Sequence, residues 1–144
     1  MSKRRVLILC TGNSVRSQMA EGLLRHLGGD TLEVHSAGTA PVGVSPLAIE
    51  AMREISIDIT AHRSKSVSEF VGQRFDTVIT VCDSAAGHCP VFPGAPKRIH
   101  WSIIDPGGAT GSHTDKLAAF RRTRDDLASR LRSFLFSHTA PKNS

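Results

Sequence analysis

Aromatic residues and cysteines are scarce in this chain. The first shortage argues against a nucleic-acid partner, and the second bears on the cellular compartment. The 144 residues contain no tyrosine, one tryptophan and three cysteines. Nucleic-acid-binding surfaces interleave basic residues with aromatic ones, so we expect no nucleic-acid partner although the formal net charge is +5. No apolar run approaches the roughly 20 residues of a membrane-spanning helix, so we expect no membrane partner.

The three cysteines also indicate a cellular compartment. The apolar run at residues 6–10 is too short for the hydrophobic part of a secretion signal. Cysteines in a chain without such a signal indicate a reducing, cytoplasmic location, where thiols usually serve chemistry rather than structural bridges.

Short apolar runs alternate with helical patterns along the chain. We expect strands at residues 6–10, 32–37, 77–81 and 99–101. Period-3.6 patterns and helix-start signals predict helices at residues 17–27, 46–55 and 114–137, and a short helix opening at Ser66. This order is typical of an α/β protein with a single-domain open parallel four-stranded sheet and helices on both faces, here formed by residues 1–138. Residues 139–144 are expected to form a flexible tail.

Reactive residue types gather at the ends of these strands. Cys10, Cys82 and the segment after Trp101 each follow an expected strand. Ligands of open parallel sheets bind outside the carboxyl ends of the strands, so the sequence predicts that the chemistry lies at one edge of the sheet.

The strongest local signal is a Cys-x5-Arg-Ser segment between the first strand and the first helix. Gly12 lets the backbone turn N–H groups inward, and the helix that begins near Ser17 directs its positive end at the same point. Arg16 adds a planar fork for two anion oxygens, and these positive groups favour the reactive thiolate of Cys10. A buried structural cysteine is the alternative, but the strand, glycine and helix around it favour a loop that binds a tetrahedral oxyanion. The residues expected to bind the oxyanion are Thr11, Gly12, Asn13, Ser14, Val15, Arg16 and Ser17.

A second pair of cysteines follows the third expected strand. If residues 83–88 are helical, the sulfurs of Cys82 and Cys89 lie about 10 Å apart, whereas a disulfide needs Cα atoms within about 7 Å. Joining the two sulfurs then requires the segment to unwind, which Gly87 and Pro90 favour. Beside this redox switch, two alternatives stay open. The cysteines are inert and buried, or they bind zinc with His88, a site for which further ligands with the usual spacing are lacking.

The Cys-x5-Arg-Ser segment, the Gln18-Met19-Ala20-Glu21 that follows it and the distant Asp105-Pro106 resemble the low-molecular-weight protein tyrosine phosphatase fold. The resemblance implies that Cys10 is the nucleophile, that Arg16 binds the oxyanion and that Asp105 is the general acid. From the residues alone, Asp105 also fits a turn, because Asp-Pro-Gly-Gly is a common turn composition.

Within that fold, Cys10, Cys82 and Cys89, with His100-Trp101 before Asp105, resemble the thioredoxin-coupled arsenate reductases. This resemblance implies arsenate as substrate, with phosphate or sulfate as analogues, and no bound cofactor. It also implies a relay in which Cys10 attacks arsenate, Cys82 attacks Cys10 and Cys89 attacks Cys82. Thioredoxin would then reduce the Cys82–Cys89 disulfide and supply the reducing equivalents.

Other functions share parts of this site. A phosphatase would use Cys10, Arg16 and Asp105 and leave Cys82 and Cys89 idle, and weak phosphatase side activity fits the reductase too. A non-catalytic arsenite- or oxyanion-binding protein and a glutaredoxin-linked reductase are further alternatives.

The resemblance also bears on a cation site. Asn13, Glu21 and Ser36 match positions that help to hold potassium in some members of the family, but this chain has Lys65 where those carry an aspartate. Either the ammonium of Lys65 replaces the cation by pairing with Glu21, or Lys65 is an exposed loop residue. We predict no bound metal, and the Lys65 departure leaves a vestigial potassium site from which we do not predict potassium dependence.

Overall fold

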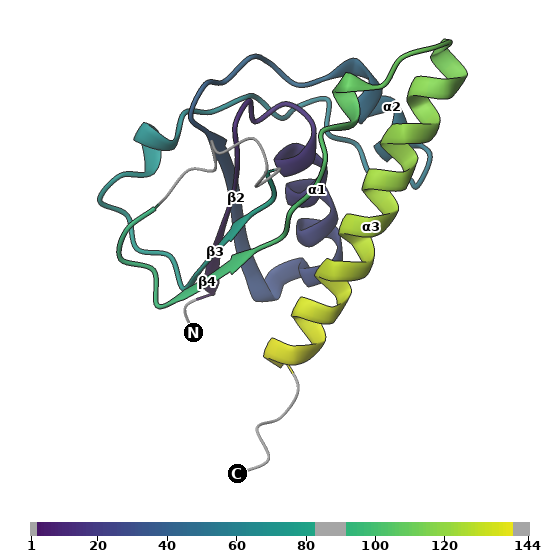
Figure 1. Ribbon diagram of the computed structural model, residues 1–144. Helices are drawn as coiled ribbons and strands as arrows, with labels where there is room; N and C mark the ends of the chain where they lie inside the picture. Colours follow the sequence, from purple (N-terminus) through teal and green to yellow (C-terminus); the bar gives the residue numbers. More distant parts are fainter. Residues whose placement is uncertain (1–2, 83–91, 140–144) are drawn as a thin grey trace.

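Four parallel strands form the sheet of this protein, for which the computed structural model describes residues 3–82 and 92–139. The strands are β1 (Arg4–Cys10), β2 (Leu32–Gly38), β3 (Thr77–Thr80) and β4 (Lys97–His100), in the order β2-β1-β3-β4. The predicted four-stranded parallel sheet is therefore confirmed (Figure 1). Cys89, the segment at residues 83–88 and all of the expected tail except Thr139, which ends the last helix, lie outside the described residues.

β1 is an inner strand with both faces covered. From Val6 to Cys10 every residue is at most 1% exposed, as its unbroken apolar sequence predicts for a parallel strand. β1 pairs with β2 from Arg4↔Leu32 to Cys10↔Gly38, and with β3 from Val6↔Thr77 to Leu9↔Thr80. By contrast, β4 forms one edge of the sheet, and three of its four residues are exposed.

The carboxyl ends of β1, β3 and β4 meet at one edge of the sheet. Beyond the paired residues, the Val81 amide donates to the Leu9 carbonyl at 2.9 Å, and the Trp101 amide donates to the Thr80 carbonyl at 2.8 Å. The segments that carry Cys10, Cys82 and Asp105 therefore leave the sheet side by side, as the sequence predicts.

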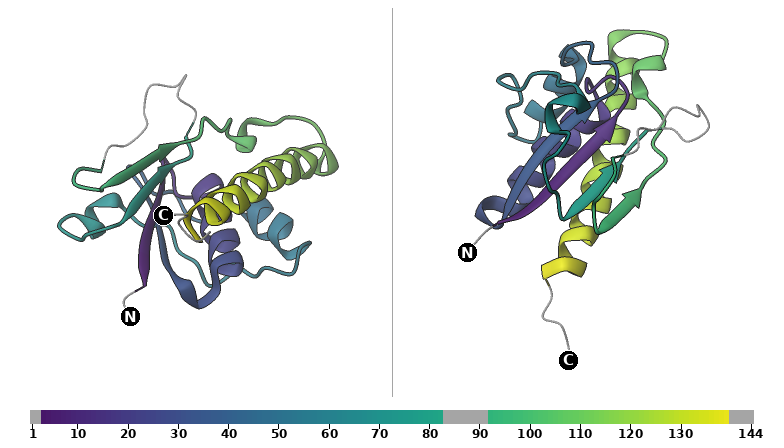
Figure 2. Two further views of the ribbon diagram at one scale, coloured as in Figure 1. Left: turned by 90° about the horizontal axis from the view of Figure 1, so that it is seen from below. Right: turned by 90° about the vertical axis from the view of Figure 1, so that its left-hand side faces the viewer.

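The three α-helices in the described part of the chain pack on one face of the sheet (Figures 1 and 2). They are α1 (Arg16–Gly28), α2 (Pro46–Arg53) and α3 (His113–Thr139). Ser45 caps α2 as predicted, because its hydroxyl accepts the Ala48 amide at 3.4 Å. Leu24, Met52, Leu127 and Leu131 are fully buried in the core between these helices and the sheet. None of the helices in residues 3–82 and 92–139 is long and apolar enough to cross a membrane.

Aromatic side chains cover the other face of the sheet. Leu7 and Leu9 pack there with Phe70, Phe75 and Phe92. The predicted helix that opens at Ser66 is a single 3-10 turn, η2 (Val67–Phe70), because the chain extends at Val71 and then takes a positive φ of 87° at Gly72. In the residues that the structure describes, this face therefore carries a 3-10 turn and loops where the sequence led us to expect helices.

Candidate active site

A cavity of about 270 Å³ opens at the carboxyl end of β1. It brings together six residues that the sequence predicts for the site with four that it does not. The predicted ones are Cys10, Gly12, Ser14, Val15, Arg16 and Asp105, and the others are Val42, Ser45, Gly107 and Phe120. Cys10 is a free thiol, 1% exposed, at the point where β1 passes into the loop. We call residues 10–17 the oxyanion loop and this space the oxyanion cavity.

Asn13 fixes the shape of the oxyanion loop through hydrogen bonds of its buried side chain. Its φ of 46° is left-handed, a conformation that asparagine adopts more readily than most residues, and its side chain is fully buried. The side-chain oxygen accepts the Gln18 amide at 2.9 Å and the Lys65 backbone amide at 2.8 Å. The side-chain nitrogen donates to the hydroxyls of Ser17 at 2.7 Å and Ser36 at 2.9 Å. The amide is thus fully committed to the scaffold, and Asn13 shapes the loop.

Ser17 is aimed at the reactive sulfur. Its hydroxyl oxygen lies 2.8 Å from the sulfur of Cys10 and also accepts the Asn13 amide. Once Cys10 is ionised the sulfur has no hydrogen to give, so the Ser17 hydroxyl must be the donor of this pair. Val15 at the start of α1 contributes no side-chain cap to the helix, which leaves the first amides of α1 available to a bound anion. Both features stabilise negative charge at this end of the cavity.

Arg16 is anchored in place before any anion binds. One terminal nitrogen donates to the Ile103 carbonyl at 2.9 Å, the other lies 3.9 Å from a carboxylate oxygen of Asp105, and the side chain is 9% exposed. Asp105 is half exposed, and its other oxygen accepts the Gly107 amide at 2.9 Å. The two roles considered for Asp105, turn residue and general acid, are therefore compatible. The turn holds the Asp105 carboxyl at the cavity beside Arg16.

A buried ionic cluster supports the oxyanion loop from the side away from the cavity. The ammonium of Lys65 lies 3.3 Å from Glu21, and the Ser36 hydroxyl that accepts from Asn13 donates to the same carboxylate. Lys65 and Glu21 side chains are 13% and 4% exposed, so the expectation of an exposed Lys65 is wrong and the expected pairing is confirmed. In residues 3–82 and 92–139, no group of three or more His, Cys, Asp or Glu side chains is arranged to hold a metal ion.

Electrostatics in this cluster keep Glu21 charged. Burial alone would raise the pKa of Glu21, but the Ser36 hydrogen bond and the charges of Lys65, His62 and Arg25 outweigh it and hold the pKa below its ordinary value. For His62, which lies 3.8 Å from Glu21, burial has a larger effect on the pKa than the nearby charges have. Burial lowers the pKa of His62 in spite of the nearby carboxylate, and the Nδ1 atom of its ring lies 3.0 Å from the side-chain oxygen of Gln18.

Removing the Lys65 ammonium is expected to destabilise the fold in a pH-dependent way. We expect Lys65→Met to cost on the order of 2 kcal/mol at pH 7.5, because it removes one partner of a buried carboxylate that keeps others. Glu21 contributes stability above its unfolded pKa that is lost as the pH falls through its lowered folded pKa. The variant binds the Glu21 proton more readily, so its deficit against the parent should shrink on acidification. Urea unfolding at pH 7.5 and 4.5 measures both effects.

The matched control for this test is Lys116→Met, which removes the same charge from an exposed position in the first turns of α3. We expect it to change the free energy of unfolding by less than about 0.5 kcal/mol. A Lys65→Met deficit that is the same at both pH values would contradict the role assigned to the Glu21 pair.

Four described residues that the sequence predicts for the site do not line the cavity: Thr11, Asn13, Ser17 and Cys82. Cys82 is 2% exposed and disulfide-bonded, and its carbonyl accepts the Ile103 amide at 3.4 Å. It follows β3, the strand that pairs with β1, but it does not line the oxyanion cavity. Cys89 lies outside the described residues.

Gly38 is a structural residue of the site that sequence reasoning missed. It ends β2 opposite Cys10, and a Cβ there would lie 2.3 Å from the Thr11 carbonyl oxygen and 2.9 Å from the Asn13 amide. Any larger residue would push the oxyanion loop out of place. The only sign of this role in the sequence is a glycine at the end of a predicted strand. A glycine there can reflect a close approach of another backbone segment, but it can also have other causes.

Comparisons with known proteins agree with this geometry. Residues 5–143 match the family model of the low molecular weight phosphotyrosine protein phosphatases. An arsenate reductase of Halalkalibacterium halodurans is 44% identical over 134 residues, which cover 93% of this chain and 96% of that protein.

Solved structures give the same result. An arsenate reductase in a phosphate-binding state superposes with a TM-score of 0.78 at 30% identity, over 93% of this chain and 98% of that one. A thioredoxin-dependent arsenate reductase of Corynebacterium glutamicum has a TM-score of 0.72 at 27% identity, over 94% of this chain and 61% of that one. With its Cys-x5-Arg loop, its parallel sheet and a family match along nearly its whole length, this chain belongs to the low molecular weight phosphotyrosine protein phosphatase family.

Proposed function

We propose that this chain is a cytoplasmic arsenate reductase that converts arsenate to arsenite through three cysteines and is regenerated by thioredoxin. The observation that carries the proposal is a free, buried Cys10 in an oxyanion cavity, with a second cysteine, Cys82, at the end of the neighbouring strand. The arsenate reductases among its relatives support the substrate, and the thioredoxin-dependent one supports the electron donor.

In the first step, arsenate binds in the oxyanion loop with two of its oxygens toward Arg16. The Cys10 thiolate attacks arsenic, and Asp105 protonates the oxygen that departs as water. The Ser17 hydroxyl, 2.8 Å from the sulfur, stabilises the thiolate before the attack. The product of this step is a covalent bond between the Cys10 sulfur and arsenic(V).

The next two steps move the oxidation away from arsenic. The Cys82 thiolate attacks the Cys10 sulfur, the sulfur–arsenic bond breaks, and its electron pair leaves with arsenic as arsenite, now arsenic(III). A Cys10–Cys82 disulfide remains, and the Cys89 thiolate then attacks Cys82 to free Cys10. Thioredoxin reduces the resulting Cys82–Cys89 disulfide with its own two thiols. Electrons thus pass from thioredoxin to arsenic through the three cysteines, and this relay requires no bound cofactor.

Two features of the structure support this relay. The free Cys10 beside a disulfide-bonded Cys82 corresponds to the state that the last exchange step leaves behind. Cys82 is buried and its carbonyl accepts from Ile103, so its sulfur reaches Cys10 or thioredoxin only if the segment after β3 rearranges. That Cys89 is the disulfide partner of Cys82 is part of the proposal, because Cys89 lies outside the described residues.

The family also supports a second activity at the same cavity. Hydrolysis of an aryl phosphate needs only Cys10, Arg16 and Asp105, which all line the oxyanion cavity. We propose this phosphatase reaction as a weak side activity.

The purified protein tests the proposal in an assay coupled to NADPH. With thioredoxin, thioredoxin reductase and NADPH, we expect arsenate to cause one equivalent of NADPH oxidation per arsenite formed, for many turnovers per protein. Multiple turnovers exclude a protein that only binds arsenite, and a parallel assay with glutaredoxin, glutathione and glutathione reductase identifies the donor. If arsenate causes no NADPH oxidation with either donor while an aryl phosphate is hydrolysed, the protein is a phosphatase and the proposal is wrong.

A further inference from the structure

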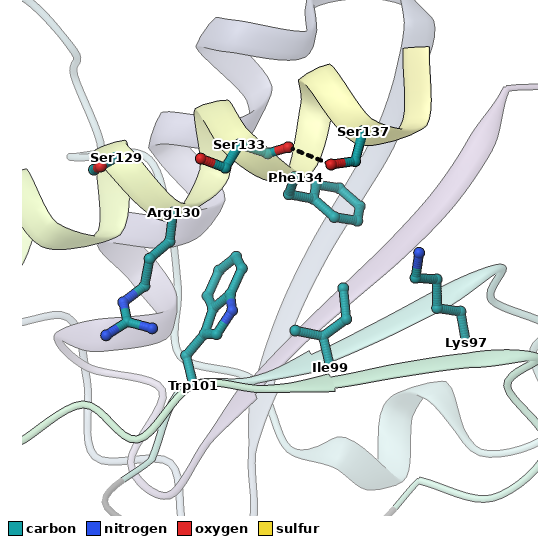
Figure 3. Close-up of a pocket in the computed structure, with 8 residues that line it drawn as sticks. All are labelled: Lys97, Ile99, Trp101, Ser129, Arg130, Ser133, Phe134 and Ser137. Carbon is teal, nitrogen blue, oxygen red and sulfur yellow. Dashed lines mark hydrogen bonds between the residues drawn. The ribbon is translucent and has the colours of Figure 1, made fainter. Parts of the chain in front are cut away.

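A second recess lies between the edge strand β4 and the carboxyl-terminal half of α3. Its volume is about 380 Å³, and none of its lining residues belongs to the oxyanion cavity. Figure 3 shows side chains from both elements pointing into the space between the strand and the helix. We call this space the β4–α3 recess. Its size is at the lower end of the range of small-molecule sites, which begins at about 300 Å³.

Part of the wall of the recess is apolar and aromatic, and the serines of α3, Ser129, Ser133 and Ser137, form a polar part. Ile99 and Trp101 rise from the sheet, and Phe134 lies across from Ile99 on α3 (Figure 3). Trp101, the single tryptophan of the chain, is only half-buried. A large flat side chain that stays half open to solvent beside other apolar groups is a surface on which an aromatic or aliphatic ligand gains contact area.

Cations lie at opposite sides of this apolar wall. Arg130 hangs from α3 beside Trp101, and Lys97 stands beyond Ile99 (Figure 3). Arg130 gives its Nε hydrogen to Asp126 at 2.9 Å, but a guanidinium carries five N–H donors and can serve a second acid group. The Arg130 side chain is 40% exposed, so this second acid group can approach from solvent.

We propose that the β4–α3 recess binds a small amphipathic organic anion. The apolar body of the ligand lies on Trp101, Ile99 and Phe134, and its acid group pairs with Arg130 or Lys97. The net charge of +5 favours an anion and disfavours a second copy of the same basic face. The site is independent of the oxyanion cavity, so arsenate and phosphate do not compete for it.

Trp101 makes the proposal directly measurable. Excitation at 295 nm addresses this one residue, and the probe is 8-anilinonaphthalene-1-sulfonate, an aromatic sulfonate that accepts energy from tryptophan. We expect saturable energy transfer from Trp101 in the full-length protein. The matched neutral probe, N-phenyl-1-naphthylamine, has the same rings without the acid group, and we expect it to bind at least tenfold more weakly.

Two variants on one helix separate the recess from general charge effects. Arg130→Gln should weaken binding of the sulfonate about tenfold, as expected for loss of a charge-assisted hydrogen bond. Arg132→Gln removes the same charge from an exposed position of α3 outside the recess and should change the affinity by less than twofold. Saturating inorganic phosphate, which fills the oxyanion cavity, should leave the binding unchanged. Equal effects of the two variants, equal affinity of the neutral probe, or displacement by phosphate would each overturn the proposal.

Discussion

Cys10→Ser is expected to abolish arsenate reduction and aryl phosphate hydrolysis together. Loss of the nucleophile in covalent enzymes lowers turnover by roughly 10⁴- to 10⁶-fold, and neither reaction has a second route in this cavity. Serine is close to cysteine in size, and position 10 is buried at the end of β1. The variant should therefore fold like the parent and keep the loop, Arg16 and the first amides of α1.

The informative control is that Cys10→Ser still binds an oxyanion. Phosphate should raise the melting temperature of the variant and of the parent by similar amounts, because a ligand stabilises the folded state according to its concentration and dissociation constant. Arg16→Met should do the reverse and lose most of this stabilisation, since the guanidinium is the positively charged side chain that lines the cavity. Residual arsenate turnover above about 1% in Cys10→Ser would show that another sulfur initiates the reaction.

Serine substitutions of the other two cysteines are expected to stop the relay at different steps. With one addition of arsenate and no thioredoxin, Cys82→Ser should release no arsenite, because nothing displaces arsenic from Cys10. Cys89→Ser should release one equivalent of arsenite per protein and then stop as a Cys10–Cys82 disulfide. Both variants should lose steady-state arsenate turnover by at least about 10³-fold. Quantifying arsenite after the single addition measures the difference.

Phosphatase activity is the internal control of this experiment. Hydrolysis of an aryl phosphate needs neither Cys82 nor Cys89, so both variants should retain it within about twofold of the parent. Mass spectrometry of the trapped Cys89→Ser protein should identify the Cys10–Cys82 disulfide. If both variants reduce arsenate at the parental rate, the two cysteines take no part and the three-cysteine mechanism is wrong.

The sheet and the oxyanion loop could be predicted from the sequence because both depend on neighbouring residues. The apolar run before Cys10 has the composition of a buried parallel strand, and Arg16 and Ser17 stand at a fixed short spacing from Cys10. Local spacing therefore specifies five of the ten residues that line the cavity. The prediction that Asp105 joins it depended on the family resemblance, because Asp105 lies 89 positions after Arg16 in the sequence.

Features that depend on distant contacts were harder to predict. Gly38 matters because its Cα lies against the Thr11 carbonyl, a contact that no pattern in the sequence encodes. Lys65 left two alternatives open, since a lysine in a polar loop is ordinarily solvated, whereas here its ammonium contacts the buried Glu21 carboxylate. The short helix expected at Ser66 became a 3-10 turn, because its length was set by the chain direction at Val71 and Gly72.

The exposed position of β4 has a consequence for the behaviour of this protein at high concentration. Unpaired strand edges present backbone groups that can pair with another molecule and seed aggregates. Lys97 and Arg98 are both exposed on this strand, so two molecules that approached edge to edge would bring like charges together. The same repulsion would disfavour the joining of two β4 edges into one continuous sheet when the protein is concentrated.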